Sequence, residues 1–229
     1  RRPPRSTLSS SSAASDVYKR QLLDRYGNKF YAVEVDIASV DYLRKELPQL
    51  SDRLLNVDFL RIDFSHFPSS NLAIIGNLPY NISSQIFFKI LDNRNVVTDA
   101  VCMVQREVAQ RIAQGPGSKV YGILSVLLQA YYNVEYLFTV NEGVFIPPPK
   151  VKSAVIRLTR NSIDTLGCDE SLFFRVVKAA FNQRRKTLLN SIRAVFPNAD
   201  SNGPYLNQRP EQLSVAQFVE LTRWVEGLR

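Results

Sequence analysis

The chain has 229 residues, of which 45% are hydrophobic, and carries a formal net charge of +8. This length suits one good-sized domain, or one domain with a small appendage, and no apolar run approaches the ~20 residues that span a bilayer. Its two cysteines, Cys102 and Cys168, define neither a disulfide framework nor a metal-ligand spacing. We therefore expect a cytoplasmic protein with no membrane segment and no metal.

The positive charge is concentrated at the two ends of the chain. Residues 1–20 hold five Lys and Arg against one acid, residues 21–170 fifteen against sixteen, and residues 171–229 nine against four. Between Ser171 and Ala199 there are six basic residues and no acid. A solvated helix face explains such a run in an average protein, but the run also fits the electrostatic footprint of a protein that binds a phosphate backbone.

The first twenty residues differ in composition from the rest. They are rich in Ser and Arg, show no hydrophobic period and lack the apolar core of at least ~7 residues that a secretory signal needs. The composition faintly resembles a transit peptide, but an unrelated leader explains it better, because α/β patterning begins only near Leu22. We expect residues 1–20 to be disordered and exclude them from the fold.

From Leu22 onward, short β-friendly runs alternate with runs of helical period. The predicted strands cover residues 30–35, 53–57, 72–75 and 99–104. The predicted helices cover residues 39–47, 83–91 and 106–112, with Ser83 as a helix cap. Strands and helices that alternate at this spacing indicate an α/β fold, with a mostly parallel sheet and helices on both faces.

The pattern changes in the second half of the chain. A helix continues over 121–132, and two strands over 134–140 and 153–158 form an expected antiparallel pair around the stretch FIPPPKV. After about Asn161 the strands cease, and helical stretches follow near 169–182, 183–195 and 214–228. The sequence thus predicts an α/β domain over residues 21–160 and a small all-α domain over residues 161–229.

Three consecutive predicted strands end in a polar residue: Glu34, Asp58 and Asn77. A carboxylate after an early strand of a nucleotide-binding fold characteristically accepts hydrogen bonds from ribose hydroxyls. A second carboxylate one strand over is placed to accept from the exocyclic amine of an adenine. A single acid at a strand end usually means nothing, but the ordered trio predicts a site for an adenosine-containing cofactor.

The stretch Asn77-Leu78-Pro79-Tyr80 suits chemistry on the exocyclic amine of a nucleobase. Such an amine is a poor nucleophile, and acceptors aimed at its N–H bonds favour the reactive form in the transition state. The Asn77 side-chain oxygen and the Leu78 carbonyl are the predicted acceptors, while Pro79 fixes the turn. Tyr80 offers a face on which an extruded base stacks. No general base is required if the methyl group comes from a sulfonium, because the sulfur then leaves as a neutral thioether.

Three motifs carry a family resemblance. They are NLPYN from Asn77, FIPPPKVKSAVIRL from Phe145 and AFNQRRKTLLN from Ala180. Together they closely resemble the bacterial small-subunit ribosomal RNA adenine dimethyltransferases, the family linked to kasugamycin resistance, from about Leu22 to the C-terminus. The resemblance implies a Rossmann-like methyltransferase fold, S-adenosylmethionine as cofactor, and N6,N6-dimethylation of two adjacent adenines in a hairpin near the 3′ end of the rRNA.

The resemblance also implies roles for individual residues. Glu34 would hold the cofactor ribose and Asp58 its adenine. Asn77 to Tyr80 would hold the target base, and Phe145 would close over that base from the opposite face. Arg184, Arg185 and Lys186 would meet the RNA backbone of the small-subunit rRNA or of its 30S precursor. We expect a monomer.

One family feature is missing from its expected place. A strand and a Gly-rich turn should lie ~20 residues before the ribose carboxylate, but the first glycine in the chain is Gly27. We therefore expect an N-terminally truncated copy behind an unrelated leader. Such a copy would bind S-adenosylmethionine weakly or not at all.

Three alternatives remain open from the sequence. A non-catalytic RNA-binding or ribosome-assembly module fits a chain that lacks the Gly-rich turn. The macrolide-resistance methyltransferases of large-subunit rRNA share an Asn-x-Pro-Tyr turn, although the two later motifs look less like theirs. DNA adenine methyltransferases use a related turn, but an appended target-recognition domain is not evident in this sequence.

Overall fold

The computed structural model describes the backbone of residues 10–228 and the side chains of residues 17–228. The chain folds into two compact units. The first contains the chain up to Pro68 together with Val140–Lys152, and the second contains Ser69–Thr139 together with the chain from Ser153 onward.

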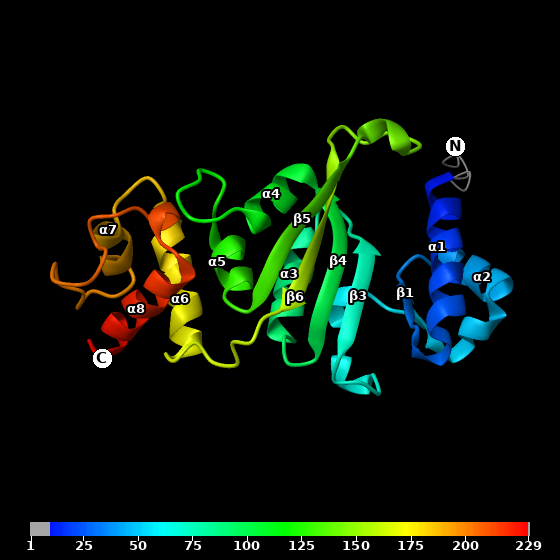
Figure 1. The fold of residues 1–229 in the computed structure, drawn as a ribbon, viewed down its shortest axis with the longest axis horizontal. Coiled ribbons are helices and arrows are strands. Elements are labelled where there is room, and N and C mark those ends of the chain that lie inside the picture. The colour runs from blue at the N-terminus through cyan, green and yellow to red at the C-terminus, as the bar shows by residue number, and fades with distance from the viewer. Residues whose placement is uncertain (1–9, 229) are drawn as a thin grey trace, which may run out of the picture. The chain divides into compact units, whose positions relative to one another are not determined.

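The first unit has a parallel pair of strands and two helices (Figure 1). In chain order they are α1 (Ser10–Tyr26), β1 (Ala32–Glu34), α2 (Ile37–Glu46) and β2 (Leu54–Asn56). One apolar cluster joins all four, with Leu23 of α1 packed among Val40, Leu43 and Leu54. Asp36 caps α2, because its side chain accepts a hydrogen bond from the Ser39 backbone N–H at 2.8 Å.

The prediction that residues 1–20 are disordered is wrong for residues 10–20, which lie in α1. Residues 1–9 lie outside the described part of the chain. The helix forms because its second half contributes Leu23 to the core of the first unit, and this contact compensates for the absence of a hydrophobic period in its first half.

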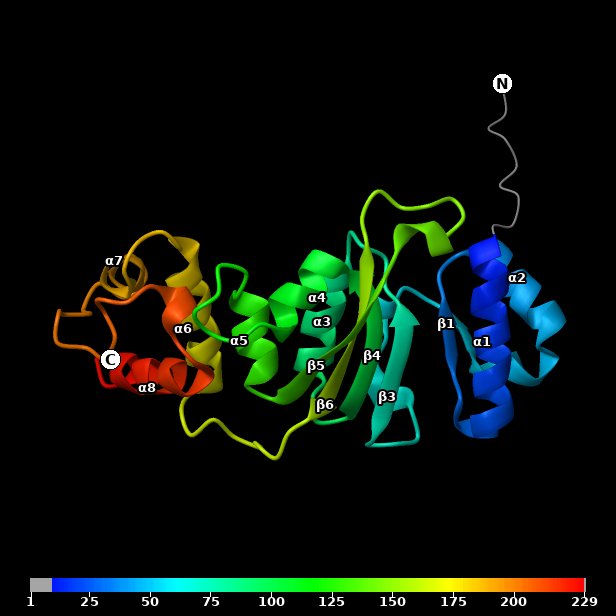
Figure 2. The same ribbon diagram turned by 45° about the horizontal axis from the view of Figure 1, so that its top comes forward.

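The second unit is built on a four-stranded sheet in the order β3-β4-β6-β5. The strands are β3 (Leu72–Asn77), β4 (Val97–Gln105), β5 (Tyr132–Val140) and β6 (Ser153–Arg160). β3 runs parallel to β4, and β6 runs antiparallel to β4. The helices α3 (Ser83–Asp92), α4 (Arg106–Ala113) and α5 (Ile123–Gln129) lie between the strands in sequence, and Figure 2 shows α3 and α4 beside the sheet.

The C-terminal part of the second unit is helical. It contains α6 (Glu170–Asn182), α7 (Leu188–Arg193) and α8 (Val215–Glu226), with α6 in contact with both other helices. Asp169 and Ser214 cap α6 and α8 through hydrogen bonds to backbone N–H groups. Helices α6 and α8 also contact α5, so the contacts of the chain do not divide at residue 160. The division into domains at 160/161 stays a prediction.

The predicted α/β class is confirmed, and each predicted strand and helix has a counterpart within a few residues. The prediction of one mostly parallel sheet is wrong, because β1 and β2 pair separately and the four-stranded sheet is mixed, with β6 antiparallel to β4. Ser83 is not a cap: it is the first residue of α3, Ile82 precedes it as N-cap, and the Ser83 hydroxyl donates instead to the Tyr80 carbonyl. The helix near 183–195 is shorter than predicted, because α7 begins only at Leu188.

Candidate active site

The turn after β3 is held by backbone hydrogen bonds. Leu78 donates its N–H to the Met103 carbonyl at 3.0 Å, which continues the β3–β4 pairing one residue beyond Asn77. Ile82 donates its N–H to the Pro79 carbonyl, and the Ser83 hydroxyl donates to the Tyr80 carbonyl at 3.2 Å. The turn is therefore fixed by the neighbouring strand on one side and by the start of α3 on the other.

This turn leaves the two predicted acceptors without partners inside the protein. Within the described residues, neither the Asn77 side-chain amide nor the Leu78 carbonyl takes part in a hydrogen bond. Asn77 is exposed, whereas the Leu78 side chain is buried and anchors the turn. Two acceptors without protein partners, on a turn of fixed conformation, are suited to receive N–H groups from a ligand.

Tyr80 is fixed by its side chain as well as by its backbone. Its hydroxyl shares a hydrogen bond of 2.6 Å with the hydroxyl of Ser153, the first residue of β6. Ser153 is fully buried and Tyr80 is half-buried. Ser153 belongs to the second family motif, FIPPPKVKSAVIRL, but the sequence predicted no role for it, because nothing local reveals a partner 73 residues away.

Glu34 and Asp58 belong to the first unit and lie at one edge of its strand pair. Glu34 ends β1 opposite Asn56, which ends β2, and Asp58 follows two residues later. Their positions at the carboxyl edge of parallel strands match the predicted placement. Both side chains are half-buried.

Both carboxylates already accept hydrogen bonds. One oxygen of Glu34, Oε1, accepts from the backbone N–H groups of Val35 at 3.1 Å and Asp36 at 3.3 Å. Its other oxygen, Oε2, lies 3.7 Å from the ammonium of Lys19 in α1, a contact the sequence did not predict. Asp58 caps the short 3-10 turn Phe59–Arg61 by accepting from the Leu60 N–H at 3.0 Å.

Phe145 also belongs to the first unit. It follows the 3-10 turn Glu142–Val144, donates its N–H to the Glu142 carbonyl and is half-buried. The predicted site residues are thus divided: Glu34, Asp58 and Phe145 lie in one unit, and Asn77, Leu78, Pro79 and Tyr80 lie in the other.

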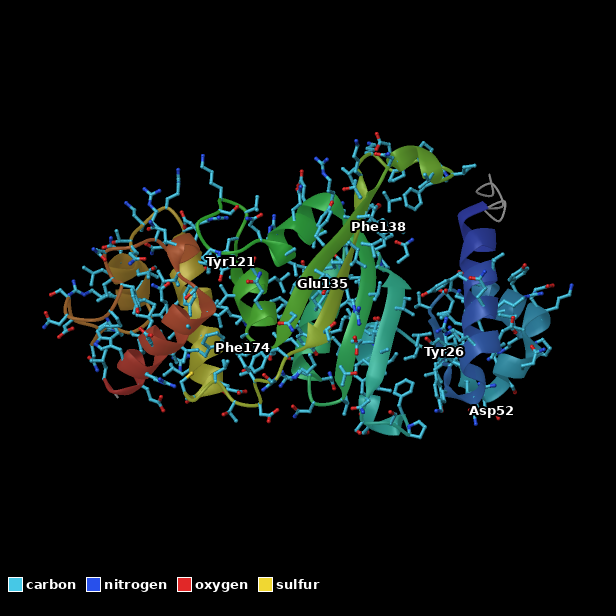
Figure 3. The ribbon with its side chains drawn as sticks, viewed as in Figure 1. Tyr26, Asp52, Tyr121, Glu135, Phe138 and Phe174 are labelled. Carbon is cyan, nitrogen blue, oxygen red and sulfur yellow. The ribbon has the colours of Figure 1, made fainter. Side chains whose placement is uncertain are left out.

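The three predicted RNA-binding residues follow α6, and their environments differ. The Arg184 guanidinium donates to the backbone carbonyls of Lys119 and Tyr121, and its side chain is half-buried. Arg185 and Lys186 are exposed. Figure 3 marks Tyr121, whose ring packs against Phe181 with the ring centroids 6.4 Å apart. Arg184 therefore has a structural partner, whereas Arg185 and Lys186 present their charges to solvent.

The described residues hold neither a metal-ligand cluster nor a membrane-spanning helix. No group of His, Cys, Asp and Glu in residues 17–228 has the arrangement of a metal site. No helix within the described chain is long and apolar enough to span a membrane.

The order of strands and helices defines the class of protein by its fold, that of the Rossmann-like methyltransferases. Two solved structures share this fold. A dimethyladenosine transferase from Plasmodium falciparum matches with a TM-score of 0.69 and 21% identity over 86% of this chain and 81% of its own. The 23S rRNA methyltransferase ErmE matches with a TM-score of 0.60 and 22% identity over 85% and 80%.

Sequence comparison is more specific. The family model described as "Ribosomal RNA adenine dimethylase" matches residues 17–226. A protein from Parabacteroides distasonis named "Ribosomal RNA small subunit methyltransferase A" is 56% identical over 204 residues, which cover 88% of this chain and 77% of the relative. A protein of the same name from Bacteroides fragilis is 57% identical over 197 residues, which cover 85% of this chain and 72% of the relative. The chain belongs to the ribosomal RNA adenine dimethylase family, as the sequence motifs predicted, and the S-adenosylmethionine-dependent methyltransferase class is confirmed.

Proposed function

We propose that this chain transfers methyl groups from S-adenosylmethionine to N6 of two adjacent adenines in a hairpin near the 3′ end of small-subunit rRNA. The observation that carries the proposal is the Asn77-Leu78-Pro79-Tyr80 turn, with its fixed backbone and its two unused acceptors. The names of the similar relatives favour small-subunit rRNA over the large-subunit rRNA of the macrolide-resistance enzymes.

The roles of the residues follow from their chemistry. The Asn77 side-chain oxygen and the Leu78 carbonyl accept the two N–H bonds of the target amine and favour its pyramidal, nucleophilic form. Tyr80 stacks on the extruded base, and Phe145 closes over it. When bound, the cofactor would supply the methyl group from its sulfonium: the N–C bond would form as the C–S bond breaks, the sulfur would leave as a neutral thioether, and the surplus proton on N6 would pass to water. Much of the rate then comes from alignment, so the residues that hold the base in position carry the catalysis.

The carboxylates of the first unit fit the adenosine part of the cofactor. Ribose hydroxyls and an adenine amine are donors, and ionised Glu34 and Asp58 are acceptors. The Lys19 ammonium competes with these donors for Oε2 of Glu34. Replacement of Lys19 by Met should therefore tighten cofactor binding, whereas Glu34→Gln and Asp58→Asn should weaken it, as measured by titration calorimetry.

The partner is the small-subunit rRNA or the 30S precursor, and the setting is the cytoplasm. Arg185 and Lys186 provide exposed charge for phosphate contacts. We propose that the chain acts as a monomer, a state that light scattering of the purified protein would check.

Labelled methyl transfer to under-methylated 30S subunits tests the function. The wild type should incorporate up to four methyls per subunit, because two adenines each accept two by the proposed reaction, and Asn77→Ala should lose at least ~100-fold in rate, as typical for removal of a preorganised acceptor. Asn133→Ala, which removes an exposed amide from β5 of the same unit, is the matched control for general damage. Incorporation into 50S subunits in place of 30S would refute the proposed substrate.

A non-catalytic RNA-binding module is the second candidate, and the Lys19–Glu34 contact favours it. In that case the chain binds under-methylated 30S subunits but neither binds cofactor nor transfers methyl groups. Cofactor titration together with a 30S binding assay separates the two candidates, because only the methyltransferase gives a signal in both.

A further inference from the structure

The environment of Ser153 connects β6 to the proposed base-binding turn. Ser153 is 0% exposed, and among the described residues its hydroxyl has one hydrogen-bond partner, the Tyr80 hydroxyl at 2.6 Å. A buried hydroxyl with a single partner is costly to leave unpaired, so the two groups hold each other in place. We infer that Ser153 is a positioning residue that fixes the Tyr80 ring for stacking on the target base, an inference that rests on the proposed function.

Ser153 is held in place by the strand pairing of the sheet and does not lie in a loop. Ser153 lies opposite Gln105 in the antiparallel pairing of β6 with β4, and Leu78 is bonded to Met103 of the same β4 strand. The hydroxyl of Tyr80 and the backbone of its turn are therefore attached to neighbouring strands of one sheet. Because the strands are rigid relative to one another, the direction of the Tyr80 ring is set before any RNA binds.

The hydrogen bond between Ser153 and Tyr80 should affect the rate of methyl transfer more than the affinity for RNA. Binding of a long RNA depends mainly on phosphate contacts, which neither hydroxyl makes. Methyl transfer depends on the alignment of the amine with the methyl group, and a stacked base follows the ring it lies against. Loss of the hydrogen bond leaves the ring in place but free to turn, so the expected effect is a lower kcat with little change in KM.

A double-mutant cycle tests the inference. The variants are Ser153→Ala, Tyr80→Phe and the double variant, assayed for methyl transfer to under-methylated 30S subunits. We expect each single variant to lower kcat about tenfold with KM changed less than about twofold. The double variant should be no slower than either single one, because both changes remove the same hydrogen bond.

Thr222→Val is the matched control. Thr222 is also 0% exposed, and within the described chain its hydroxyl bonds only to the Phe218 carbonyl of its own helix. Thr222→Val therefore removes a buried hydroxyl that has no link to the turn. Its kcat should be unchanged even if its stability falls as much as that of Ser153→Ala. A purely structural role for Ser153 would make the two variants behave alike.

A fluorescence readout makes the test independent of methyl transfer. In an rRNA hairpin with 2-aminopurine at a target adenine, stacking on Tyr80 should quench the bound probe. Ser153→Ala and Tyr80→Phe should each leave it brighter, and Thr222→Val should not. Unchanged kcat and unchanged probe fluorescence in Ser153→Ala would overturn the inference, as would multiplying effects in the double variant.

The outcomes also separate this inference from the proposed function. An active wild type with an unaffected Ser153→Ala variant refutes the role of Ser153 alone. A wild type that transfers no methyl but quenches the probe refutes catalysis by this chain, and the fluorescence cycle then decides on Ser153. A wild type that neither transfers methyl groups nor quenches the probe overturns both the proposed function and the role of Ser153.

Discussion

The guanidinium of Arg184 donates a hydrogen bond of 3.0 Å to the backbone carbonyl of Tyr121, 63 residues earlier in the chain. A second hydrogen bond from the same Nη2 atom reaches the Lys119 carbonyl. Arg184 thus ties the segment before α5 to the end of α6. Its neighbours Arg185 and Lys186 are exposed and make no such contact within the described chain.

The first prediction separates Arg184 from Arg185. Arg184→Ala should lower the free energy of unfolding by about 1–3 kcal/mol, because two backbone carbonyls lose a charged donor. Arg185→Ala should change it by less than about 0.5 kcal/mol. The Arg185→Ala variant should instead bind 30S subunits more weakly, and the slope of its log binding constant against log salt concentration should be smaller by about 1. Equal stability losses in the two variants would contradict this assignment.

The second prediction concerns Gly203, which lies against the indole of Trp224. A Cβ at this position would lie 2.5–2.7 Å from three ring atoms, closer than packed atoms approach. Gly203→Ala should therefore destabilise the helical part by about 1–3 kcal/mol through overpacking.

Trp224 is the only tryptophan, so its fluorescence reports both the native environment and the unfolding transition. Gly115→Ala is the control, because a Cβ there meets nothing within 4 Å. An unchanged emission spectrum and midpoint in Gly203→Ala would show that the Trp224 ring moves aside at little cost.

The third prediction is a pH dependence at the start of α2. Hydrogen bonds from the Ser39 side chain and backbone lower the pKa of Asp36 below its ordinary value of 3.8. Since the folded pKa is depressed, the stabilisation is fully present above the unfolded pKa and is lost as pH falls through the folded value.

Denaturant unfolding of wild type and Asp36→Asn between neutral pH and pH 2 measures this effect. The difference between the two proteins should be constant from neutral pH down to about pH 5 and should shrink below about pH 4, where the carboxylate becomes protonated. A difference that persists unchanged at pH 2 would mean that the charge of Asp36 contributes nothing.

The fourth prediction concerns the two thiols. Complete burial raises the pKa of the Cys102 thiol to about 12. Cys168 is partly exposed, and burial raises its pKa as well. Because the thiolate is the reacting species and must be reached by the reagent, Cys168 should be modified first by a disulfide reagent, and Cys102 only on unfolding.

The variant Cys168→Ser isolates the buried thiol of Cys102. In that variant, native protein should react slowly, and denaturant should raise the rate in parallel with the loss of structure. Fast labelling of native Cys168→Ser would show that β4 opens locally at Cys102.

Sequence patterns predicted the elements well where the pattern is local. The strand ending at Asn77 and the helix starting near Ser83 are bounded by residues with strong turn and helix preferences. The role of Ser83 was predicted wrongly, because its hydroxyl bonds backwards to the Tyr80 carbonyl and not forwards into the helix. The helicity of residues 10–20 was missed, because it depends on the contact of Leu23 with a core assembled from later residues.

The sequence by itself determined the family and the α/β class, and it predicted a chemistry for the Asn77–Tyr80 turn, since motifs and periodicities are properties of neighbouring residues. Only the tertiary structure decided which side chains are already engaged: Arg184 with the Tyr121 carbonyl, Tyr80 with Ser153, and Glu34 with Lys19. The physical reason is that these partners lie far apart in the chain. Their distances depend on how the strands and helices pack, and no local pattern records that packing.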